Sequence, residues 1–571
     1  MTTQQLLVAN QSSNVGFLQS GAGASPRTAE SKLRDTVSVK DFGAVGDGVT
    51  DDTAAIQLAL NNGTTTQRVV WLPAGTYKIS SRLVVGSHTG LASNGDATLF
   101  ATAAGFNYAG GPKGTGGNNS LVIDLSGQLV APFTPNTNQI IEGLRIISEL
   151  SDGRTVDAIA ARNCTNVKIV GNEIANFPNT RSVTLASVIG GEVSGNWIHN
   201  CTTNYTGWSP LRPQITGVEV DNDRVNSINS ARLQISDNRI EQLTVGAAVL
   251  AYAGYETDGV NIHYGNAVVV DNIIDTVGEG VDTFASDGVI SNNIITNTYN
   301  FGIKLIHGAS RNVITGNRIT NTGIAGILLS GSNVSGVTDC EGNTVTGNAI
   351  DNVDYLGAWS SSTGVSGIKI DGSTEPSVAK NNLIAANFLD GSANYGLITG
   401  QAAHKNIYAG NRIAAAPALS YVGGSETLSV SDALPTRVRT HRTATQSIPA
   451  QTATKVQFNT VGFDARNEFN TTNNRWVCQI PGVYSVIAQV RFAGSSVPLN
   501  TNLQLSIRRN NVSVCDATAL ANLSDQTFSI VDSVFCNAGD YLEIWYYQDN
   551  TSAQDITGNS ALSFFSVTSA Q

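Results

Sequence analysis

A short pattern, in which asparagine is followed two residues later by isoleucine or leucine, recurs through the middle of the chain. It constrains the fold more than any other feature. The pattern reads GNEI, GNWI, DNRI, DNII, NNII, GNRI, GNAI, ANFL and GNRI, and its asparagines are Asn172, Asn196, Asn238, Asn272, Asn293, Asn317, Asn348, Asn387 and Asn411. Successive asparagines are 24, 42, 34, 21, 24, 31, 39 and 24 residues apart. The short gaps fit one rung of a stacked β-solenoid, and the long gaps fit a rung plus an insertion. Asparagine tolerates the left-handed turn at each corner and bonds to its copies along the stack, so we predict a structural role for these side chains.

A second strand lies between successive asparagines and usually begins with glycine, as in GVEVD, GVDTF, GIKLI and GIKID. Strand alternation places the second and fourth residues inside and the third outside. The inward pairs include Val218/Val220, Ile303/Leu305, Ile327/Leu329 and Ile368/Ile370. The expected outward column is Thr184, Glu219, Ala248, Asp282, Lys304, Leu328, Lys369 and Ile398. Rungs stack about 4.8 Å apart, so this register puts Glu219 and Asp282 roughly 9–10 Å apart at their backbones.

Composition excludes several classes of protein. The 571 residues carry a net charge of −11, which argues against a nucleic-acid surface, because phosphate binding needs clustered lysine and arginine. No apolar run approaches the ~18 residues of a membrane helix, and the N-terminus does not resemble a signal peptide. The six cysteines are far apart, so we expect free thiols in a chain made in a reducing cytoplasm. The sequence indicates no metal ion and no cofactor.

The acidic residues of the segment DFGAVGDGVTDDTAAIQLAL have a structural explanation. A strand before Gly46 and a turn at Gly46–Gly48 are followed by a helix that Thr50 can cap, with Asp51 and Asp52 in its first turn. Ala55, Ile56, Ala59 and Leu60 form the apolar face of this helix, and Gly63 can end it. We therefore expect the chemistry to lie elsewhere in the chain.

This segment, together with the following VVWLPAGTYKI, resembles the start of the parallel β-helix in the pectate-lyase-like superfamily. In that superfamily the helix caps the open end of the solenoid, and the same motif is frequent in bacteriophage tailspikes and capsule depolymerases. The resemblance implies an all-β fold with a right-handed parallel β-helix over residues 36–425. It is specific for the fold and weak for chemistry, because the superfamily includes lyases, hydrolases and binding proteins.

The repeat ends after Asn411, and we expect a linker over 426–439. From 440 to 571 the stretch NRWVCQIPGVYSVIAQVRF resembles the jelly-roll domain of the complement C1q and tumour-necrosis-factor group, in which an aromatic-x-Cys-x-x-Pro-Gly-x-Tyr run marks a core strand pair. Such domains are usually trimeric, so the resemblance implies a homotrimer, and a lectin-like role of this jelly-roll in carbohydrate binding is left open. Residues 1–35 are expected to form a neck that attaches to a phage tail or baseplate, in a protein of the virion that acts at the host cell surface.

The outward column fits cleavage of a bacterial surface polysaccharide. Two carboxylates about 6.5–9.5 Å apart leave room for water in an inverting glycosidase, and Asp282 with Glu219 is the lead pair. Glu279 is a third catalytic candidate. Lys304, His307 and Asp221 are candidates for substrate binding. A polysaccharide lyase, with Lys304, His307 or a tyrosine as base, and a spike that binds without cleaving remain open.

The long gaps predict insertion loops at 204–216, 252–266 and 351–366. Aromatic residues are concentrated in these loops, and exposed aromatic rings suit stacking on sugar faces. The candidates for sugar binding are Trp208, Tyr252, Tyr255, Tyr264 and Trp359.

Overall fold

The computed structural model forms two compact units, Met1–Asn382 with Gly391–Asn394, and Leu383–Asp390 with Tyr395–Gln571. The predicted linker at 426–439 falls within the second unit. The structure describes residues 13, 15–102, 106, 121–149, 156–178, 181–203, 214–222, 228–245, 256–331, 339–359, 364–371, 378–391, 395–400, 403–413, 418–421, 428–430, 436–464, 466–492, 497–521 and 526–569.

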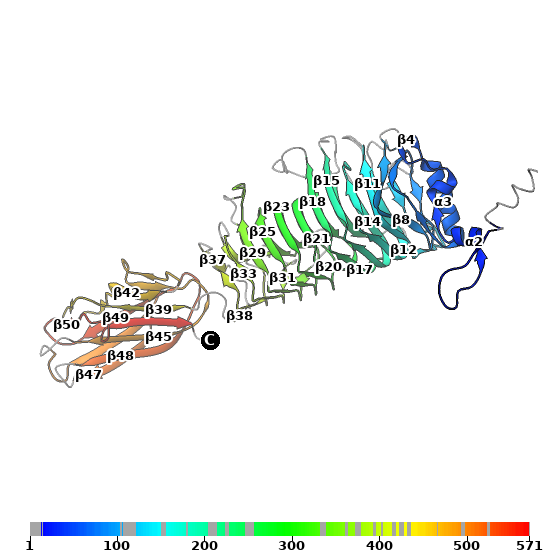
Figure 1. Ribbon diagram of the computed structural model, residues 1–571. Helices are drawn as coiled ribbons and strands as arrows, with labels where there is room; N and C mark the ends of the chain where they lie inside the picture. The colour runs from blue at the N-terminus through cyan, green and yellow to red at the C-terminus, as the bar shows by residue number, and fades with distance from the viewer. Residues whose placement is uncertain are drawn as a thin grey trace, which may run out of the picture. The chain divides into compact units, whose positions relative to one another are not determined.

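Most of the first unit is a parallel β-helix in which three strand columns wind around an apolar core (Figure 1). The first face contains β8 (Gly90–Ala101), β11 (Ile140–Ser148), β13 (Glu173–Ala175), β15 (Trp197–Thr203), β18 (Arg239–Val245), β21 (Ile273–Thr283), β23 (Ile294–Leu305), β25 (Arg318–Thr322) and β29 (Ala349–Val353). The second face adds β5 (Val69–Trp71), β12 (Asp157–Val170), β14 (Arg181–Ser194), β17 (Ser230–Ser236), β20 (Gly265–Val270), β22 (Val289–Ser291), β24 (Val313–Thr315) and β28 (Thr344–Thr346).

The third face carries the predicted outward column. It contains β7 (Leu83–Val84), β9 (Leu121–Asp124), β16 (Gln214–Asp221), β19 (Glu256–Ile262), β26 (Ala325–Ser330) and β30 (Ser366–Asp371), together with segments of β12, β14, β21 and β23, which bend across two faces. The remaining short strands are β3 (Val37–Ser38), β4 (Asp47–Asp51), β6 (Gly75–Ile79), β10 (Asn136–Thr137), β27 (Cys340–Glu341) and β31 (Ala379–Lys380).

The asparagine ladder is confirmed as structural. From Asn196 to Asn348, each side-chain Oδ1 accepts from the backbone N–H and the Nδ2 of the asparagine one rung earlier, as Asn293 does from Asn272 at 3.0 and 2.9 Å. The Nδ2 of Asn293 also donates to the Val269 carbonyl at 3.0 Å. A second ladder, which the sequence analysis did not identify, joins the buried residues Asn312, Asn343 and Asn382. These ladders satisfy backbone groups that the corners would otherwise bury without partners.

Glycines begin the third-face strands because the chain bends there against the opposite wall. A Cβ on Gly280 would lie 2.5 Å from Cγ2 of Ile295 and 2.4 Å from the Gly302 carbonyl, and Gly259 is equally close to Ile274. No larger side chain fits such an approach.

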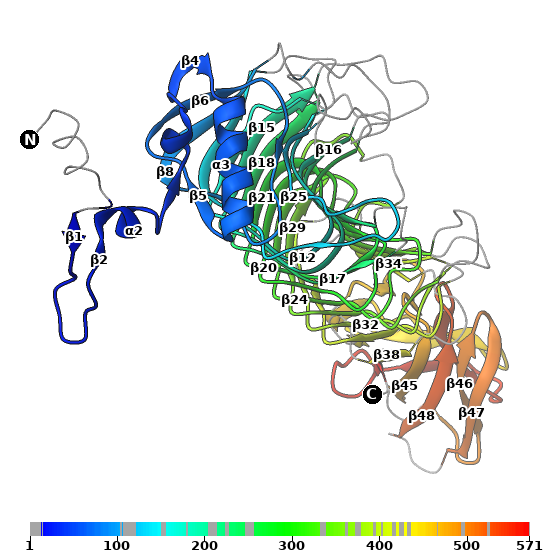
Figure 2. The same cartoon turned by 90° about the vertical axis from the view of Figure 1, so that its right-hand side faces the viewer.

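The N-terminal region begins with β1 (Gly16–Phe17), β2 (Arg27–Thr28) and α2 (Ala29–Leu33). A predicted strand over 36–45 is only partly present, because β3 gives way to the 3-10 helix η2 (Val39–Phe42). The helix α3 (Thr53–Thr66) lies across the first rungs, as Figure 2 shows.

The sequence analysis misplaced both ends of α3. The residue before its first turn is Asp52, not Thr50, and the helix runs past Gly63 to a left-handed Gln67. Asp52 is buried and accepts from the backbone N–H of Val45 at 2.6 Å and of Gly46 at 2.9 Å, so its carboxylate holds the preceding loop instead of the helix terminus. Its role is structural, as predicted.

In the second unit, parallel strands occur at β32 (Leu383–Ala385), β33 (Phe388–Leu389), β34 (Tyr395–Thr399), β35 (Ile407–Ala409), β36 (Arg412–Ile413), β37 (Ala418–Tyr421) and β38 (Leu428–Val430). They are followed by an antiparallel β region with strands β39 (Arg437–His441), β40 (Gln446–Ile448), β41 (Thr454–Lys455), β42 (Thr460–Asp464), β43 (Phe469–Asn470), β44 (Arg475–Val477), β45 (Gly482–Arg491), β46 (Asn502–Arg509), β47 (Val512–Leu520), β48 (Thr527–Cys536), β49 (Tyr541–Gln548), β50 (Gln554–Ile556) and β51 (Phe564–Ser569).

Two main sheets, β42-β39-β51-β45-β48 and β43-β44-β49-β46-β47, enclose the core of this antiparallel region. Trp476 and Tyr484 of the predicted signature are buried, with ring centroids 4.7 Å apart. The fold class, a parallel β-helix followed by an antiparallel β region, is therefore as predicted.

The expectation of free thiols is also met in this structure, where all six cysteines are unpaired and all but Cys515 are buried. Among the described residues, the helices are too short or too polar to cross a membrane.

Candidate functional site

The third face aligns the predicted column with one exception. Strand pairing stacks Glu219 on Asn261, Asn261 on Asp282, and Asp282 on Lys304. Glu219 and Asp282 are thus two rungs apart, as expected. The rung between them carries Asn261 instead of Ala248, because the rung strand is β19 and not the GAAVL segment at 246–250, which lies outside the described residues. Part of the loop predicted at 252–266 is this strand.

The glycine bends bring a second pair of acids to the same place. Asp258 and Glu279 are stacked neighbours that lie three residues before Asn261 and Asp282, across Gly259 and Gly280. Residues three apart in a straight strand face opposite sides, but here the Asn261 amide donates to the Asp258 carboxylate at 2.7 Å. The carboxylates of Glu219, Asp258, Glu279 and Asp282, with Asn261 and two cations, form what we call the acidic cluster.

Lys304 is the first of these cations. Its ammonium lies 2.5 Å from Glu279 Oε2 and 2.9 Å from Asp282 Oδ2, so one nitrogen bridges two carboxylates. Burial alone would lower the pKa of Lys304, but the surrounding carboxylates, those of Asp282 and Glu279 first, outweigh burial and raise this pKa far above its ordinary value. Lys304 is therefore protonated throughout the physiological pH range.

Arg181 is the second cation, and its Nε lies 2.5 Å from Glu219 Oε2. It belongs to β14, one rung before Glu219. The sequence analysis missed Arg181 because it stands outside the five-residue repeat pattern, at the start of the strand. An arginine just ahead of the strand that precedes Glu219 was the only signal available.

The cluster faces outward but is buried. Its side chains alternate with the fully buried Val218, Val220 and Val281 of the core, yet Glu219 is only 1% exposed and Asp282 only 4%. The sequence analysis predicted the outward direction of the column and not its burial. Four carboxylates lie out of water against two fixed cations, an imbalance that favours uptake of a proton or a further cation.

Aromatic rings line one side of the cluster. His263 stacks on Phe284 with ring centroids 4.7 Å apart, and His307 meets Phe284 edge-on at 4.5 Å. His263 Nδ1 is also 3.9 Å from Glu219 Oε1. Asp221 is buried two residues beyond Glu219 on the same strand face. The sequence analysis did not name His263 as a candidate, but the pairing of Ile262 with Val220 places His263 opposite Asp221 and so brings it to the site.

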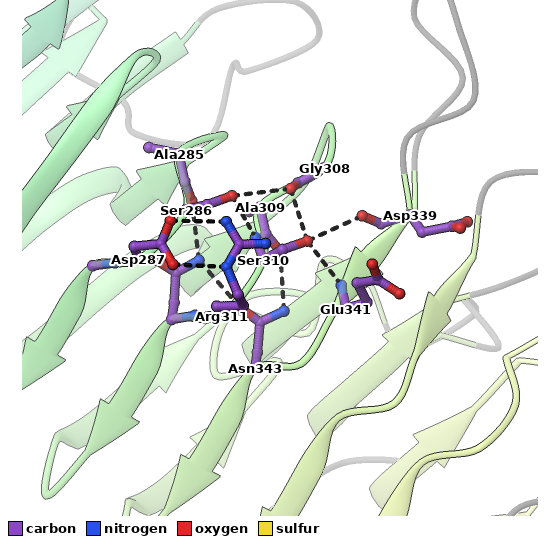
Figure 3. Close-up of polar contacts among 12 residues, drawn as sticks. Ala285, Ser286, Asp287, Gly308, Ala309, Ser310, Arg311, Asp339, Glu341 and Asn343 are labelled. Carbon is purple, nitrogen blue, oxygen red and sulfur yellow. Dashed lines mark hydrogen bonds and ion pairs between the residues drawn. The ribbon is translucent and has the colours of Figure 1, made fainter. Parts of the chain in front are cut away.

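A pocket of about 400 Å³ opens beside these rings. Its lining includes His263, Tyr264 and Phe284, with the turn at 285–287 as one wall. Figure 3 shows how this turn is held: Asp287 pairs with Arg311 through two contacts of 2.7 and 2.8 Å, and Ser286 and Ser310 bond to neighbouring backbone. Tyr264 is 44% exposed at this pocket, so its ring is available to a ligand.

Of the other aromatic candidates, Trp359 is the one that lies among the described residues. Trp359 packs edge-on against Tyr299 at 5.9 Å and donates its backbone N–H to Asp354. Trp208, Tyr252 and Tyr255 lie outside the described residues.

Comparison with known proteins identifies the family of the parallel β-helix. Residues 36–207 match the family model "Rhamnogalacturonase A/epimerase, pectate lyase-like", and residues 134–335 and 252–413 match the model of the right-handed β-helix region. The tailspike protein of E. coli bacteriophage HK620, solved in complex with a pentasaccharide, superposes with a TM-score of 0.58 at 11% identity and covers 100% of both chains. The Dettilon tailspike protein gives 0.53 at 17% identity, over 95% of this chain and 96% of its own.

Curated relatives match only locally. A probable glucan endo-1,3-β-glucosidase of Arthroderma benhamiae is 46% identical over 57 residues, which is 8% of this chain and 6% of that protein. Mannuronan C5-epimerase AlgE5 of Azotobacter vinelandii is 55% identical over 49 residues, which is 8% of this chain and 4% of the epimerase. The protein is a pectate-lyase-like right-handed β-helix protein whose structural neighbours include phage tailspikes.

Proposed function

We propose that this protein cleaves a bacterial surface polysaccharide by glycoside hydrolysis at the acidic cluster, as a tailspike of a bacteriophage. Support for a carbohydrate substrate comes from the tailspike neighbour solved with a pentasaccharide and from the local matches to a glucanase and an epimerase. The observation that carries hydrolysis is the pair of carboxylates, Glu279 and Asp282, on one ammonium.

The shared contact with Lys304 limits how far apart the two bonded carboxylate oxygens can be. These oxygens are no farther apart than the sum of 2.5 and 2.9 Å. Carboxyl groups about 5–5.5 Å apart are typical of retaining glycosidases, in which one acid protonates the leaving oxygen and the other attacks the anomeric carbon. Glu279 has the shorter contact to Lys304 and is the nucleophile in this proposal. Asp282 is the general acid. It later removes a proton from the water that hydrolyses the glycosyl-enzyme intermediate and releases the sugar.

Glu219 is the weaker partner for Asp282. Arg181 binds one of its oxygens, and Asn261 stands on the rung between the two acids, where an inverting enzyme would place its water. We therefore replace the inverting pair suggested by the sequence with Glu279 and Asp282. The geometry makes the stereochemistry of the product a test of this choice.

A lyase mechanism with Lys304 as base has no support in this site, because an ammonium held by two carboxylates cannot accept a proton. Lys304 is better suited to hold Glu279 and Asp282 in place. A lyase would need His307 or a tyrosine as its base.

The pocket beside the cluster is the proposed sugar-binding subsite. Tyr264 offers an exposed ring for stacking, and the side chains of Asn229, Asn266 and Asp287 supply polar groups around it. His307 and Asp221 would support this region. Trp208, Tyr252, Tyr255 and Trp359 remain candidates for more distant contacts with the polymer.

The direct experiment is to incubate the full chain with a panel of bacterial capsules, exopolysaccharides and O-antigens and to follow the anomeric protons of the first products by NMR. Saturated fragments released with retained configuration would support Glu279 and Asp282. Products of inverted configuration would instead indicate Glu219 as the partner of Asp282. Fragments with unsaturated ends would indicate a lyase.

The low exposure of Asp282 and Glu279 favours a second candidate, a spike that binds polysaccharide without cleaving it. In that case the panel would contain a polymer that the protein binds and leaves intact.

The assembly proposal follows the tailspike likeness. Residues 440–571 would hold a homotrimer through a C1q-like jelly-roll, for which sugar binding is a second proposed role, and residues 1–35 would attach to the phage tail. Synthesis in the host cytoplasm and a place in the virion complete this proposal.

A further inference from the structure

We propose that Glu219, Asp221 and His263 bind a divalent transition-metal ion, Zn²⁺ or Mn²⁺ by donor type. The proposal does not depend on the polysaccharide activity. The three residues each offer one ligand atom, and these atoms lie within 4.8 Å of one another.

Strand geometry explains why the three side chains converge. Glu219 and Asp221 are two residues apart on β16, so they point to the same side. His263 follows β19 on the next rung, and its backbone N–H bonds to the Val220 carbonyl at 2.8 Å, which sets the imidazole beside both carboxylates. Two donors from one strand and a third from the adjacent rung form a triangle on the outer face.

One carboxylate oxygen in this triangle lacks a hydrogen-bond partner. Glu219 Oε1 is buried without a hydrogen-bond partner, while Arg181 binds only the other oxygen of the same carboxylate. His263 Nδ1 is 3.9 Å from this oxygen, too far for a direct hydrogen bond. Two ligands of one ion, each bonded at about 2.0–2.2 Å, are separated by roughly 3–4.4 Å. An ion between these atoms would satisfy the buried oxygen.

The supporting contacts hold the donors in place. Asp221 Oδ1 accepts from the Asn222 backbone N–H at 2.8 Å, and the His263 ring is stacked on Phe284. Ligands fixed in this way by neighbouring groups are characteristic of metal sites. His263 also lines the 400 Å³ pocket, which supplies a route from solvent.

The charge and the donor type select the ion. Asp221 and the acidic cluster together hold five carboxylates against Arg181 and Lys304, so a dication would offset much of the excess. An imidazole nitrogen with two carboxylates suits Zn²⁺ or Mn²⁺, whereas Ca²⁺ and Mg²⁺ take oxygen ligands.

The test is calorimetric titration of the chelator-treated full chain with Zn²⁺, Mn²⁺ and Ca²⁺, with the bound ion counted by elemental analysis. We expect one Zn²⁺ or Mn²⁺ per chain at this site, and weaker binding of Ca²⁺. Asp221→Asn and His263→Gln should each weaken Zn²⁺ binding at least ~10-fold. The matched control is His199→Gln, which removes another histidine beside a carboxylate, 3.2 Å from Glu173, and should leave binding unchanged.

Equal Zn²⁺ affinity in the wild type and all three variants would overturn the proposal, as would the absence of binding by the wild type. If the two site variants do not fold, the wild type loaded with Co²⁺ decides the matter. A visible spectrum of nitrogen- and oxygen-bound Co²⁺ supports the site, and the spectrum of the free aquo ion contradicts it.

Discussion

For Lys304, the direction of the side chain could be predicted from the sequence, but its contacts could not. The outward register of Asp282 and Lys304 could be predicted from strand alternation, since inward valines and isoleucines mark the core side of each rung. The convergence of Glu279 on Lys304 could not, because it depends on the bend at Gly280. Burial of the cluster could not be predicted either, because strand alternation shows which way a side chain points and not what covers it.

Removing the Lys304 charge should destabilise the first unit. Lys304→Met leaves two buried carboxylates without their cation, a change that typically costs about 3–5 kcal/mol. Lys369→Met is the matched control: this lysine lies two rungs further in the same column, 3.9 Å from Asp371 and more exposed, and its loss should cost under about 1 kcal/mol. Denaturant unfolding measures both changes, and equal effects would contradict the account of the cluster.

The pH dependence of this difference has a defined sign. The folded state raises the pKa of Lys304, so its stabilising contribution is fully present below the unfolded value of about 10.4. It is lost only as the pH rises through the still higher folded value. The free-energy gap between wild type and Lys304→Met should therefore stay constant from pH 7 to about 10. A gap that closes within that range would show that Lys304 is not held as described.

At the scale of the element, the asparagine repeat made the rungs predictable, and their irregular lengths made one rung hard to place. The 42-residue gap between Asn196 and Asn238 and the 34-residue gap to Asn272 each contain more than one apolar segment. Both GAAVL and GVNIH follow the repeat pattern, and the rung between β16 and β21 is formed by the second of them, as part of β19. Alternation alone cannot choose between such segments, because stacking against the neighbouring rungs decides the pairing.

The ladder itself should be a large source of stability. Asn293→Ala removes the acceptor for two donors of Asn272 and the donor to the Val269 carbonyl, all of them buried. With about 1–3 kcal/mol for each buried group left unsatisfied, we expect a loss of roughly 3 kcal/mol or more. Asn292→Gly, at an exposed neighbour with φ of 56°, should change stability by less than about 1 kcal/mol. Comparable melting temperatures for the two variants would argue against the ladder's role.

The loop before α3 gives a second prediction for an element. Asp52→Ala strips two backbone N–H groups of their acceptor, so unfolding free energy should fall by about 1–3 kcal/mol for each group left buried. This exceeds the 0.3–1 kcal/mol of a helix-dipole effect, the only role that the sequence suggested. Specific activity of the folded variant should equal that of the wild type. If a folded Asp52→Ala protein lacked activity, the account would be contradicted, because the catalytic residues would then have to include Asp52.

At the scale of the whole molecule, the antiparallel region presents an apolar surface suited to assembly. The cross-strand pairs Val483–Phe535 and Ile487–Val531 lie on β45 and β48, and all four side chains are between 37% and 62% exposed. Exposed apolar pairs of this kind are candidates for an interaction surface in soluble proteins. We expect them to form part of a trimer interface.

Val531→Asp should therefore shift the trimer toward monomer in light scattering at micromolar concentration, without loss of fold. Thr452→Asp, on an exposed loop, is the control and should leave the mass unchanged. A wild-type protein that is monomeric at this concentration would refute the trimer. A trimeric Val531→Asp variant would move the interface to another surface.

The measurement that tests the central claim most directly is the turnover of Asp282→Asn on a polysaccharide that the wild type cleaves. In this variant Lys304 keeps its contact with Glu279, and the asparagine has nearly the same shape as Asp282, so we expect the variant to fold and assemble. Loss of the general acid should reduce turnover at least ~10²-fold, and Glu279→Gln should do the same. Wild-type turnover in a folded Asp282→Asn protein would contradict the account and move the active site away from the acidic cluster.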